Sequence, residues 1–413
     1  MKFTLAAALA LLVPAQEFPR GKILDGTAKS GVTWHVRVPA KHDSKRPMPA
    51  ILILHGSNMN SKAYVHTLAQ AWPKLAEDYI LIGVNGENRV KGSPDDDPAF
   101  NYTYVNFMGK SKYKGYPGTD RESPALVSEA VQELKTKLAI SKVLVGGHSQ
   151  GGFLSYNLYM NYPDLFAGAF PVSCGLLMQC EPAAFDKPEL RAQQRKGAIA
   201  IVHAENDPVV EFSMGKSAHE SFEDDAFPAV RLFADKEAAH MFALLPVEPA
   251  VRWLEAMTAE TPEAMLEFAQ KQLAAREWRD AGAALLRARD LDAKKKYGAK
   301  IKSLQQAIEK EAGAKVKEVE KLIKASKDDS WVADFVKFRS QFESSDAAKG
   351  VLEFHRKLRE QHEKPAEELF FGARQDFQSQ RRDEGYKKYE EIVKKYFASS
   401  WYRYAKGALD RRK

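Results

Sequence analysis

Short apolar runs alternate with stretches of helical periodicity over roughly the first 255 residues of this 413-residue chain. Two runs near the start, 23–24 and 32–38, predict an antiparallel hairpin. The runs that predict buried parallel strands are 50–54, 79–84, 143–145, 167–170 and 198–202, followed by a last strand at 230–233. Helical spacing of apolar residues predicts helices within 61–78, 123–138 and 153–161. Strands that alternate with helices in this way indicate an α/β fold with one mostly parallel sheet.

The strand pattern stops near residues 258–262. Beyond this point a pattern rich in Lys, Glu, Ala and Arg keeps helical spacing to the end of the chain, so we expect an α/β domain over residues 16–258 and an all-α domain over 262–413. Two segments of the second domain have the spacing of tetratricopeptide-repeat helices: Trp278, Ala281, Leu285 and Ala288, and later Gly385, Tyr389 and Ile392. The segments between them lack this signature, so a helical bundle with repeat-like ends and a true repeat solenoid both stay open.

The first fifteen residues have the layout of a secretory signal peptide. Met1-Lys2 precedes an apolar run over 3–13, and Val13-Pro14-Ala15 presents small residues where signal peptidase cleaves. We expect cleavage after Ala15 and a secreted or periplasmic mature protein; an ordinary N-terminal helix is the alternative. Neither this run nor a later stretch reaches the roughly 18 apolar residues that span a bilayer, so we expect no membrane span.

The formal net charge of +7 is compatible with a polyanionic partner. However, the basic residues of the C-terminal half are interleaved with acidic ones, as in 309–318, which is typical of a solvated helix surface. We therefore expect no nucleic-acid partner. Cys174 and Cys180 are the two cysteines, and in an exported protein they form either a bridged loop or two unrelated thiols. Two cysteines without a nearby histidine supply too few ligands for a metal site, so we expect none.

The pentapeptide Gly147-His148-Ser149-Gln150-Gly151 lies between a predicted strand and a predicted helix. A sharp turn from strand to helix needs small residues on both sides of the central serine, because side chains would collide there. Such a turn pushes the serine hydroxyl outward. The pattern therefore predicts that Ser149 is a nucleophile; the alternative is a glycine-rich turn whose serine only caps the helix.

A serine hydroxyl is a weak nucleophile at neutral pH, so it needs a base and an acid that orients this base. His240 is the predicted base, because it follows the last predicted strand in a loop of small residues. His203 and His219 fall in a predicted strand and a helical stretch, where a core or surface role is expected. Asp207 is the predicted acid, since its loop follows the strand at 198–202. Glu205 is the competing acid, and the alternative for both is a turn residue that hydrogen-bonds its own backbone.

The tetrahedral intermediate of such a reaction needs two preorganised N–H donors. One is the backbone amide of Gln150, directly after the nucleophile. The second is expected in the loop that follows the strand at 50–54, and we select the amide of Ser57, with Asn58 as the alternative.

These residues make the α/β part resemble the α/β-hydrolase superfamily, and within it secreted esterases of the polyhydroxybutyrate depolymerase, feruloyl esterase and dienelactone hydrolase group. The segments that carry the resemblance are Leu54-His55-Gly56, Gly147 to Gly152, His203 to Val210 and Ala239-His240. The resemblance covers roughly residues 20–257. It implies that Ser149, Asp207 and His240 are catalytic and that the amides of Ser57 and Gln150 bind the oxyanion. Dienelactone hydrolases have a cysteine nucleophile, which puts that reaction in doubt here, and the acid loop begins His-Ala where His-Gly is usual.

The sequence thus predicts an exported serine hydrolase that cleaves small-molecule or polymeric carboxylic esters through an acyl-enzyme, without a cofactor. One alternative is a serine peptidase of the prolyl-oligopeptidase type, which shares fold and residue order. Another is a non-catalytic scaffold whose helical domain binds protein partners. The long connection over residues 85–123, rich in Tyr and Phe, either walls the substrate pocket or packs on its own aromatic rings.

Overall fold

The computed structural model describes residues 18–43, 46–89, 102–104, 123–176, 196–224, 227–325, 329–399, 401–410 and 412. The expected signal peptide, Cys180 and most of the aromatic connection over 85–123 lie outside these residues. The chain divides into two compact units, Met1–Leu158 and Tyr159–Lys413.

Eight strands form one sheet in the order β1-β2-β4-β3-β7-β8-β9-β10. The β1/β2 and β2/β4 pairs are antiparallel, whereas β3 runs parallel to β4 and β7, and β9 runs parallel to β8 and β10. The predicted α/β fold class with a mostly parallel sheet and an antiparallel entry hairpin is thereby confirmed. The strands of this sheet are β1 (Ile23–Thr27), β2 (Thr33–Arg37), β3 (Met48–Leu54), β4 (Ile80–Val84), β7 (Ile140–His148), β8 (Gly168–Val172), β9 (Ala198–Ala204) and β10 (Val230–Asp235).

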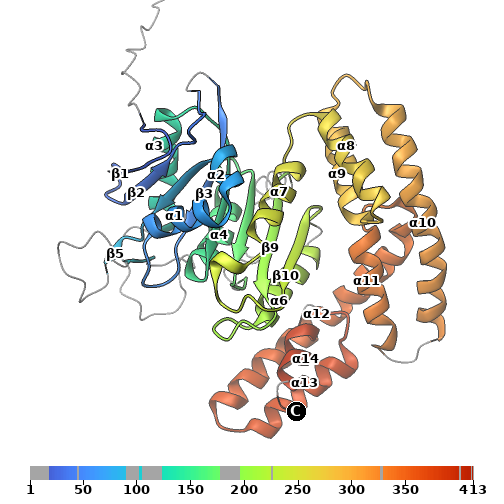
Figure 1. Ribbon diagram of the computed structural model, residues 1–413. Helices are drawn as coiled ribbons and strands as arrows, with labels where there is room; N and C mark the ends of the chain where they lie inside the picture. The colour runs from blue at the N-terminus through green and yellow to red at the C-terminus, as the bar shows by residue number, and fades with distance from the viewer. Residues whose placement is uncertain are drawn as a thin grey trace, which may run out of the picture. The chain divides into compact units, whose positions relative to one another are not determined.

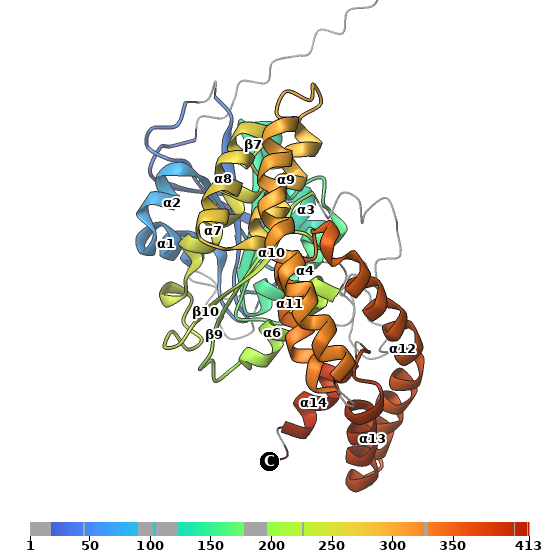
Figure 2. The same cartoon turned by 90° about the vertical axis from the view of Figure 1, so that its right-hand side faces the viewer.

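The first unit is built around β3. Its residues from Ala50 to Leu54 have no exposed surface, because helices cover both faces of the strands. On one side lie α1 (Ser61–Ala71) and α2 (Pro73–Asp78), and on the other lies α3 (Ser123–Lys137) (Figures 1 and 2). A short antiparallel pair, β5 (Asn88–Arg89) and β6 (Tyr102–Thr103), follows β4 along the chain.

In the second unit, all seven residues of β9 are buried between β8 and β10. The helix α6 (Phe212–Asp224) packs against β9 and β10, and α7 (Val247–Met257) packs against β8 and β9. α6 begins two residues after the loop that carries Asp207 to Val210. The position of α6 therefore bears directly on the loop of the predicted acid.

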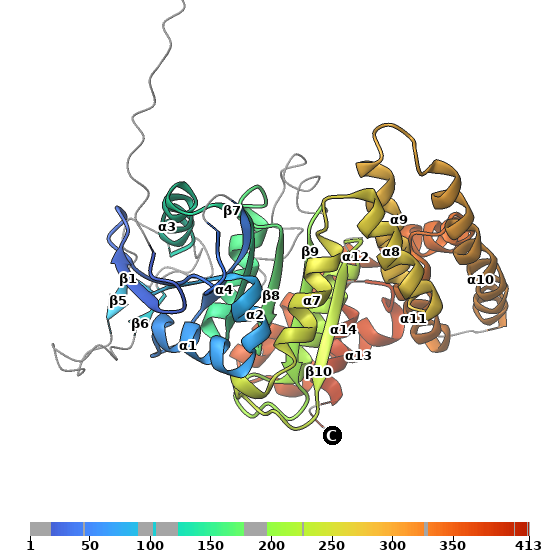
Figure 3. The ribbon, with the colours of Figure 1, turned by 45° about the horizontal axis from the view of Figure 1, so that its top comes forward.

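Every described element after α7 is helical, which confirms the predicted helical C-terminal region. α8 and α9 form a pair beside the long α10, and α12 pairs with α13 (Figures 2 and 3). The two repeat-like segments fall in α9 and α13, the second helices of these pairs, but kinship with tetratricopeptide repeats stays a prediction. Among the described residues, no helix combines the length and apolar composition that a bilayer crossing requires. The helices are α8 (Pro262–Ala274), α9 (Trp278–Leu291), α10 (Gly298–Ala325), α11 (Val332–Phe342), α12 (Lys349–Gln378), α13 (Arg382–Lys395) and α14 (Tyr402–Asp410).

Buried polar contacts join α9 to the α/β part of the second unit. The carboxylate of Asp280 accepts hydrogen bonds from Nη1 of Arg231 at 2.8 Å and from Nε1 of Trp253 at 2.7 Å. Beside it, Arg279 forms an ion pair with Glu223 of α6, whose side chain is almost fully buried. The change from strands to helices falls near the domain boundary predicted at 258–262, but the contacts continue across it. That boundary stays a prediction.

Candidate active site

The predicted nucleophile lies at a sharp turn between β7 and α4 (Gln150–Asn161). Ser149 has a φ of +53°, in the left-handed region that non-glycine residues adopt at a cost of about 1–3 kcal/mol. The helix begins directly at Gln150, three residues earlier than its apolar spacing predicts. Ser149 is therefore the single residue that reverses the chain from strand to helix.

Two glycines make this turn sterically possible. A Cβ on Gly147 would lie 2.4 Å from the carbonyl carbon and oxygen of Gly151. A Cβ on Gly151 would lie 2.5 Å from the carbonyl oxygen of Leu54 and 2.6 Å from that of His55. Only hydrogen fits at both positions, so the end of β3 packs directly against the first turn of α4.

This close packing brings the two predicted oxyanion donors onto neighbouring segments. Ser57 lies two residues after His55, and Gln150 immediately precedes Gly151. Ser57 is exposed, and the next residue, Asn58, is left-handed with a φ of +57°. Within the described residues, the backbone amides of Ser57 and Gln150 donate to no protein acceptor. Such amides are suited to hold a developing oxyanion.

The loop that carries Ser57 is held by a buried His55–Tyr104 pair. The hydroxyl of Tyr104 donates to the carbonyl of Val84 at 2.7 Å and accepts from the amide of His55 at 3.2 Å. The two rings stack with centroids 4.3 Å apart. Nε2 of His55 accepts from the amide of Gly86 at 3.0 Å, so Nδ1 carries the proton and donates to the carbonyl of Gly56 at 2.7 Å. Burial lowers the pKa of His55 to about 4, which keeps this tautomer neutral.

The side chain of Gln150 ties the nucleophile turn to the same tyrosine. Its Oε1 accepts from the amide of Tyr104 at 3.1 Å, and its Nε2 donates to the carbonyl of Tyr104 at 3.3 Å. On the other side of Ser149, Nδ1 of the buried His148 lies 2.8 Å from the hydroxyl of Tyr64. Both neighbours of the nucleophile are thus fixed by tyrosines. Tyr104, which was expected to wall the substrate pocket or pack in its loop, packs on His55.

Asp207 and His240 lie in the second unit, in the loops that follow β9 and β10. Oδ2 of Asp207 accepts a hydrogen bond from Nδ1 of His240 at 2.7 Å. Its Oδ1 accepts from the backbone amides of Val209 and Val210, each at 2.9 Å. Burial by itself raises the pKa of Asp207, but the hydrogen bonds from His240 and the two amides outweigh it and lower this pKa. The carboxylate is therefore ionised at neutral pH, whereas the competing Glu205 is exposed on the surface.

The acid loop is supported by His203, for which a core or surface role was predicted. Its Nε2 donates to the carbonyl of Val210 at 2.9 Å and lies 3.6 Å from Oδ2 of Asp207. Burial lowers the pKa of His203, so the ring is neutral there. His203 thus fixes the loop rather than competing for the role of base, and His219 lies in α6, where burial lowers its pKa to about 3.

A second contact joins the two loops one residue before each catalytic candidate. Oδ1 of Asn206 accepts from the amide of Ala239 at 2.9 Å. Ala239 is left-handed with a φ of +49°, which turns the chain so that His240 meets Asp207. Asn206 has only a weak signal in the sequence, as a short polar residue beside the acid. Tyr64 has no such signal, because its partner His148 is 84 residues away.

No group of three or more His, Cys, Asp or Glu side chains in the described part of the chain is arranged to hold a metal ion. Cys174 is a buried free thiol, and burial raises its pKa. Its alternative role in a bridged loop concerns Cys180, which lies outside the described residues.

The mostly parallel sheet with helices on both faces agrees with the predicted α/β-hydrolase fold class. Residues 38–233 match the family model described as Phospholipase/Carboxylesterase. A comparison with curated proteins gave no match.

The solved structures that this chain matches include two named as esterases and one named as a thioesterase. A thermostable esterase is 16% identical over 56% of this chain and 62% of its own, less than two thirds of its length, with a TM-score of 0.40. Zea mays acyl-protein thioesterase 2 is 17% identical over 55% of this chain and 99% of its own, with a TM-score of 0.37. The Bacillus cereus carboxylesterase is 14% identical over 57% of this chain and 94% of its own, with a TM-score of 0.36. At these scores the likeness adds no argument about substrate.

Proposed function

We propose that this protein hydrolyses carboxylic esters by a serine mechanism in which Ser149, His240 and Asp207 act together. The observation that carries the proposal is the hydrogen bond between His240 and the fully buried carboxylate of Asp207. Because Nδ1 of His240 donates to an ionised carboxylate, its Nε2 holds a lone pair that accepts a proton. The carboxylate also stabilises the imidazolium that results.

In the proposed reaction, Oγ of Ser149 gives its proton to Nε2 of His240 and attacks the carbonyl carbon of the ester. The amides of Ser57 and Gln150 donate to the oxyanion of the tetrahedral intermediate, and such a donor contributes about 3 kcal/mol. The imidazolium then protonates the leaving alcohol, and an acyl-enzyme remains on Ser149. Water, deprotonated by His240, attacks the acyl carbon and releases the carboxylic acid.

We further infer that the ester carries an apolar chain. Large apolar side chains are exposed beside the residues of this mechanism along the chain: Met59 at 43%, Val209 at 66%, Met241 at 58% and Leu244 at 58%. Met59 comes two residues after Ser57, Val209 donates its amide to Asp207, and Met241 follows His240. Exposed apolar side chains beside a polar reaction site are suited to bind the apolar part of a substrate.

A fluorophosphonate probe tests the nucleophile, since it forms a covalent bond with an activated serine hydroxyl. We expect labelling of the wild type at Ser149, found by mass spectrometry of peptides, and none in Ser149→Ala. The matched control is Ser57→Ala, which keeps the backbone amide and is expected to label normally. A folded wild type that does not react would contradict the proposal.

A substrate panel tests the reaction class. We expect p-nitrophenyl esters to be hydrolysed with a kcat/KM that rises from acetate to longer acyl chains, and peptide p-nitroanilides to react far more slowly. Faster cleavage of the anilides would favour the peptidase alternative. Absence of both activities would favour a scaffold.

We also propose that the protein is exported and that its C-terminal helices provide a surface for a protein partner. The support for export is the apolar run over 3–13 before Val13-Pro14-Ala15. N-terminal sequencing of the protein from an exporting host tests this, and a mature chain that starts at Gln16 is the expected result. Retention of Met1 would contradict export.

A further inference from the structure

The side chain of Tyr64 lies between the two segments that carry the predicted oxyanion donors. Tyr64 belongs to α1 and is almost fully buried, at 6% exposure. Its hydroxyl oxygen lies 2.8 Å from Nδ1 of His148, the residue before the predicted nucleophile. This contact joins α1 to the turn between β7 and α4. None of the steps proposed above uses the hydroxyl.

The same hydroxyl faces the backbone of Gly56, the residue before Ser57. A Cβ on Gly56 would lie 3.2 Å from this hydroxyl oxygen, 3.5 Å from Nδ1 of His148 and 3.6 Å from the carbonyl oxygen of His148. Burial raises the pKa of Tyr64 to about 12, although a hydrogen bond from the backbone of Gly56 acts in the opposite direction. The hydroxyl therefore keeps its proton at neutral pH, accepts from Gly56 and directs its proton to Nδ1 of His148.

The peptide group between Gly56 and Ser57 is the one that presents the Ser57 amide. In a trans peptide the N–H points away from the C=O, so whatever holds the carbonyl also sets the direction of the N–H. Nδ1 of His55 donates to the carbonyl of Gly56 at 2.7 Å. Tyr64 holds the amide on the other side of Gly56. Both polar groups of this glycine are thus fixed, and the direction of the Ser57 amide is fixed with them.

The first turn of α1 gives Tyr64 a rigid base. The side chain of Asn60 caps the helix by accepting from the amide of Ala63 at 2.9 Å. The amide and the hydroxyl of Ser61 both donate to Oδ1 of Asn85, the residue after β4, at 2.8 Å. All three of these polar side chains are buried, so their hydrogen bonds are shielded from water and anchor the helix to the sheet.

We propose that Tyr64 is a positioning residue that keeps the oxyanion loop and the nucleophile turn at one fixed spacing. This inference rests on the proposed function, because it concerns the two amides that hold the oxyanion. Tyr64 does not touch the reacting atoms and acts through His148 and Gly56. Without its hydroxyl, the amide of Ser57 is no longer held where the oxyanion formed by attack of Ser149 needs it. The loss therefore falls on kcat rather than on substrate binding.

Tyr64→Phe tests the proposal, because it removes the hydroxyl and keeps the ring. Well below the melting temperature, we expect kcat on a p-nitrophenyl ester to fall at least about tenfold, since removal of a whole oxyanion donor costs about 10²–10³-fold. KM is expected to stay within about twofold. An alkyl trifluoromethyl ketone forms an adduct with serine that carries an oxyanion, so we expect its inhibition constant to rise by the factor by which kcat/KM falls. A merely structural role would lower the melting temperature and leave this inhibition constant unchanged.

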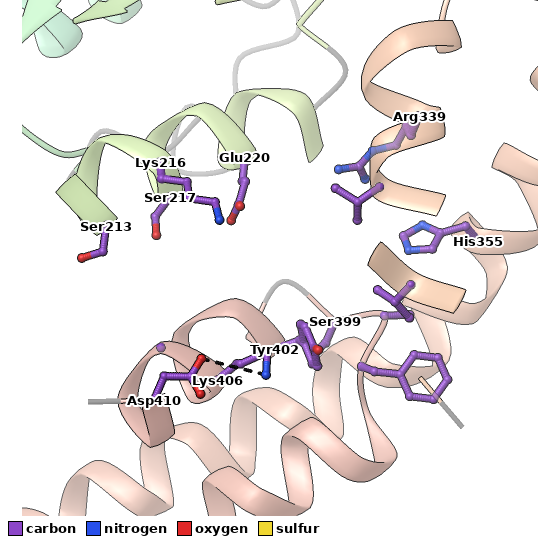
Figure 4. A pocket seen from close by; sticks show the side chains of 15 residues that line it. Ser213, Lys216, Ser217, Glu220, Arg339, His355, Ser399, Tyr402, Lys406 and Asp410 are labelled. Carbon is purple, nitrogen blue, oxygen red and sulfur yellow. Dashed lines mark ion pairs between the residues drawn. The ribbon is translucent and has the colours of Figure 1, made fainter. Parts of the chain in front are cut away.

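The matched control is Tyr402→Phe in the second unit. Tyr402 of α14 lines a pocket of about 320 Å³ together with side chains of α6, α11 and α12 (Figure 4). Within the described residues, the lining of this pocket includes none from the loops of Ser149, Asp207 or His240. We therefore expect Tyr402→Phe to keep the kcat and the inhibition constant of the wild type.

Variants of His148 test the same hydrogen bond from its other side, also in the case that Tyr64→Phe does not fold. His148→Leu removes the acceptor and is expected to lose as much kcat as Tyr64→Phe. His148→Asn keeps a hydrogen-bonding atom near the position of Nδ1 and is expected to recover most of this loss. The double variant Tyr64→Phe/His148→Leu is expected to lose no more than either single variant, because both remove one shared contact.

Three results would overturn the proposal and leave the proposed function intact. They are an unchanged kcat and inhibition constant in folded Tyr64→Phe, an equal loss of kcat in Tyr402→Phe, and additive losses in the double variant. A wild type that neither hydrolyses esters nor reacts with a fluorophosphonate probe would instead contradict the proposed function itself, and the role of Tyr64 with it.

Discussion

The carboxylate of Asp207 has no exposed surface, and its Oδ2 lies 2.7 Å from Nδ1 of His240. Two backbone amides hold the other oxygen, so the carboxylate cannot rotate away from the histidine without breaking both bonds. This geometry fixes the protonated nitrogen of the imidazole. Substitution of Asp207 is therefore expected to have a larger effect on activity than substitution of a surface carboxylate.

Asp207→Asn is expected to lower kcat by about 10³–10⁴-fold with little change in KM. The amides of Val209 and Val210 hold the carbonyl oxygen of the new side chain, so its NH₂ group faces His240 and forces the wrong tautomer. Glu205→Gln, a charge removal in the same loop at an exposed position, is the control and is expected to keep full activity. Steady-state kinetics on a p-nitrophenyl ester measures both variants. A large loss of kcat in Glu205→Gln with little loss in Asp207→Asn would make Glu205 the acid.

The same contacts predict a pH dependence of stability. Because the folded protein lowers the pKa of Asp207, its contribution to stability is complete above the unfolded value of about 3.9. It is lost as the pH falls through the lower folded value. The difference in free energy of unfolding between wild type and Asp207→Asn is expected to shrink as the pH falls from about 5 to about 2. Urea unfolding across this range measures it, and a difference that grows toward low pH would refute the assignment.

At position 149, serine is expected to make the folded protein less stable than glycine would. Its φ of +53° costs a non-glycine residue free energy that glycine does not incur. Ser149→Gly and Ser149→Ala both remove the hydroxyl and abolish activity, but only the glycine variant relieves the strain. We expect Ser149→Gly to be more stable than Ser149→Ala by about 1 kcal/mol in thermal unfolding. Equal stability of the two variants would argue against a strained turn.

Much of the α/β part could be predicted from the sequence because its signals are local. Buried strands such as β3 and β9 are continuous apolar runs, and the glycines on both sides of Ser149 mark a sharp turn within five residues. Asp207 and His240 could be selected because each follows a strand. The start of α4 at Gln150 was not predicted, because its first turn contains Gly151 and Gly152, which have no apolar side chain to extend the spacing seen at 153–161.

The supports of the site could not be predicted, because they are contacts between distant residues of ordinary type. Tyr104 reaches His55 across 49 residues, and Asn206 reaches Ala239 across 33. A tyrosine in a loop and an asparagine in a turn have many equally good local explanations. Only the packing of the sheet selects among them.

Tyr104→Phe tests whether the His55–Tyr104 pair positions the oxyanion loop. The change leaves the carbonyl of Val84 and the amide of His55 without a buried partner, at a cost of about 1–3 kcal/mol. We expect a lower melting temperature and, well below it, a reduced kcat with KM nearly unchanged, because the amide of Ser57 acts in the transition state. Tyr102→Phe, two residues away and half-buried, is the control. A purely structural role would lower stability and leave kcat of the folded enzyme intact.

Asp280→Ala tests whether the helical region and the α/β part unfold as one body. Asp280 lies on α9 and accepts from Arg231 of β10 and Trp253 of α7, so its removal leaves a buried indole N–H unpaired and leaves the partly buried guanidinium only its longer ion pair with Glu277. We expect a loss of about 2–3 kcal/mol in the free energy of unfolding. The control is Asp290→Ala on the same helix, where the carboxylate is 74% exposed and a change within about 0.5 kcal/mol is expected. If the helices formed an independent domain, Asp280→Ala would leave the temperature at which esterase activity is lost unchanged. We expect instead that this temperature falls together with the midpoint of unfolding.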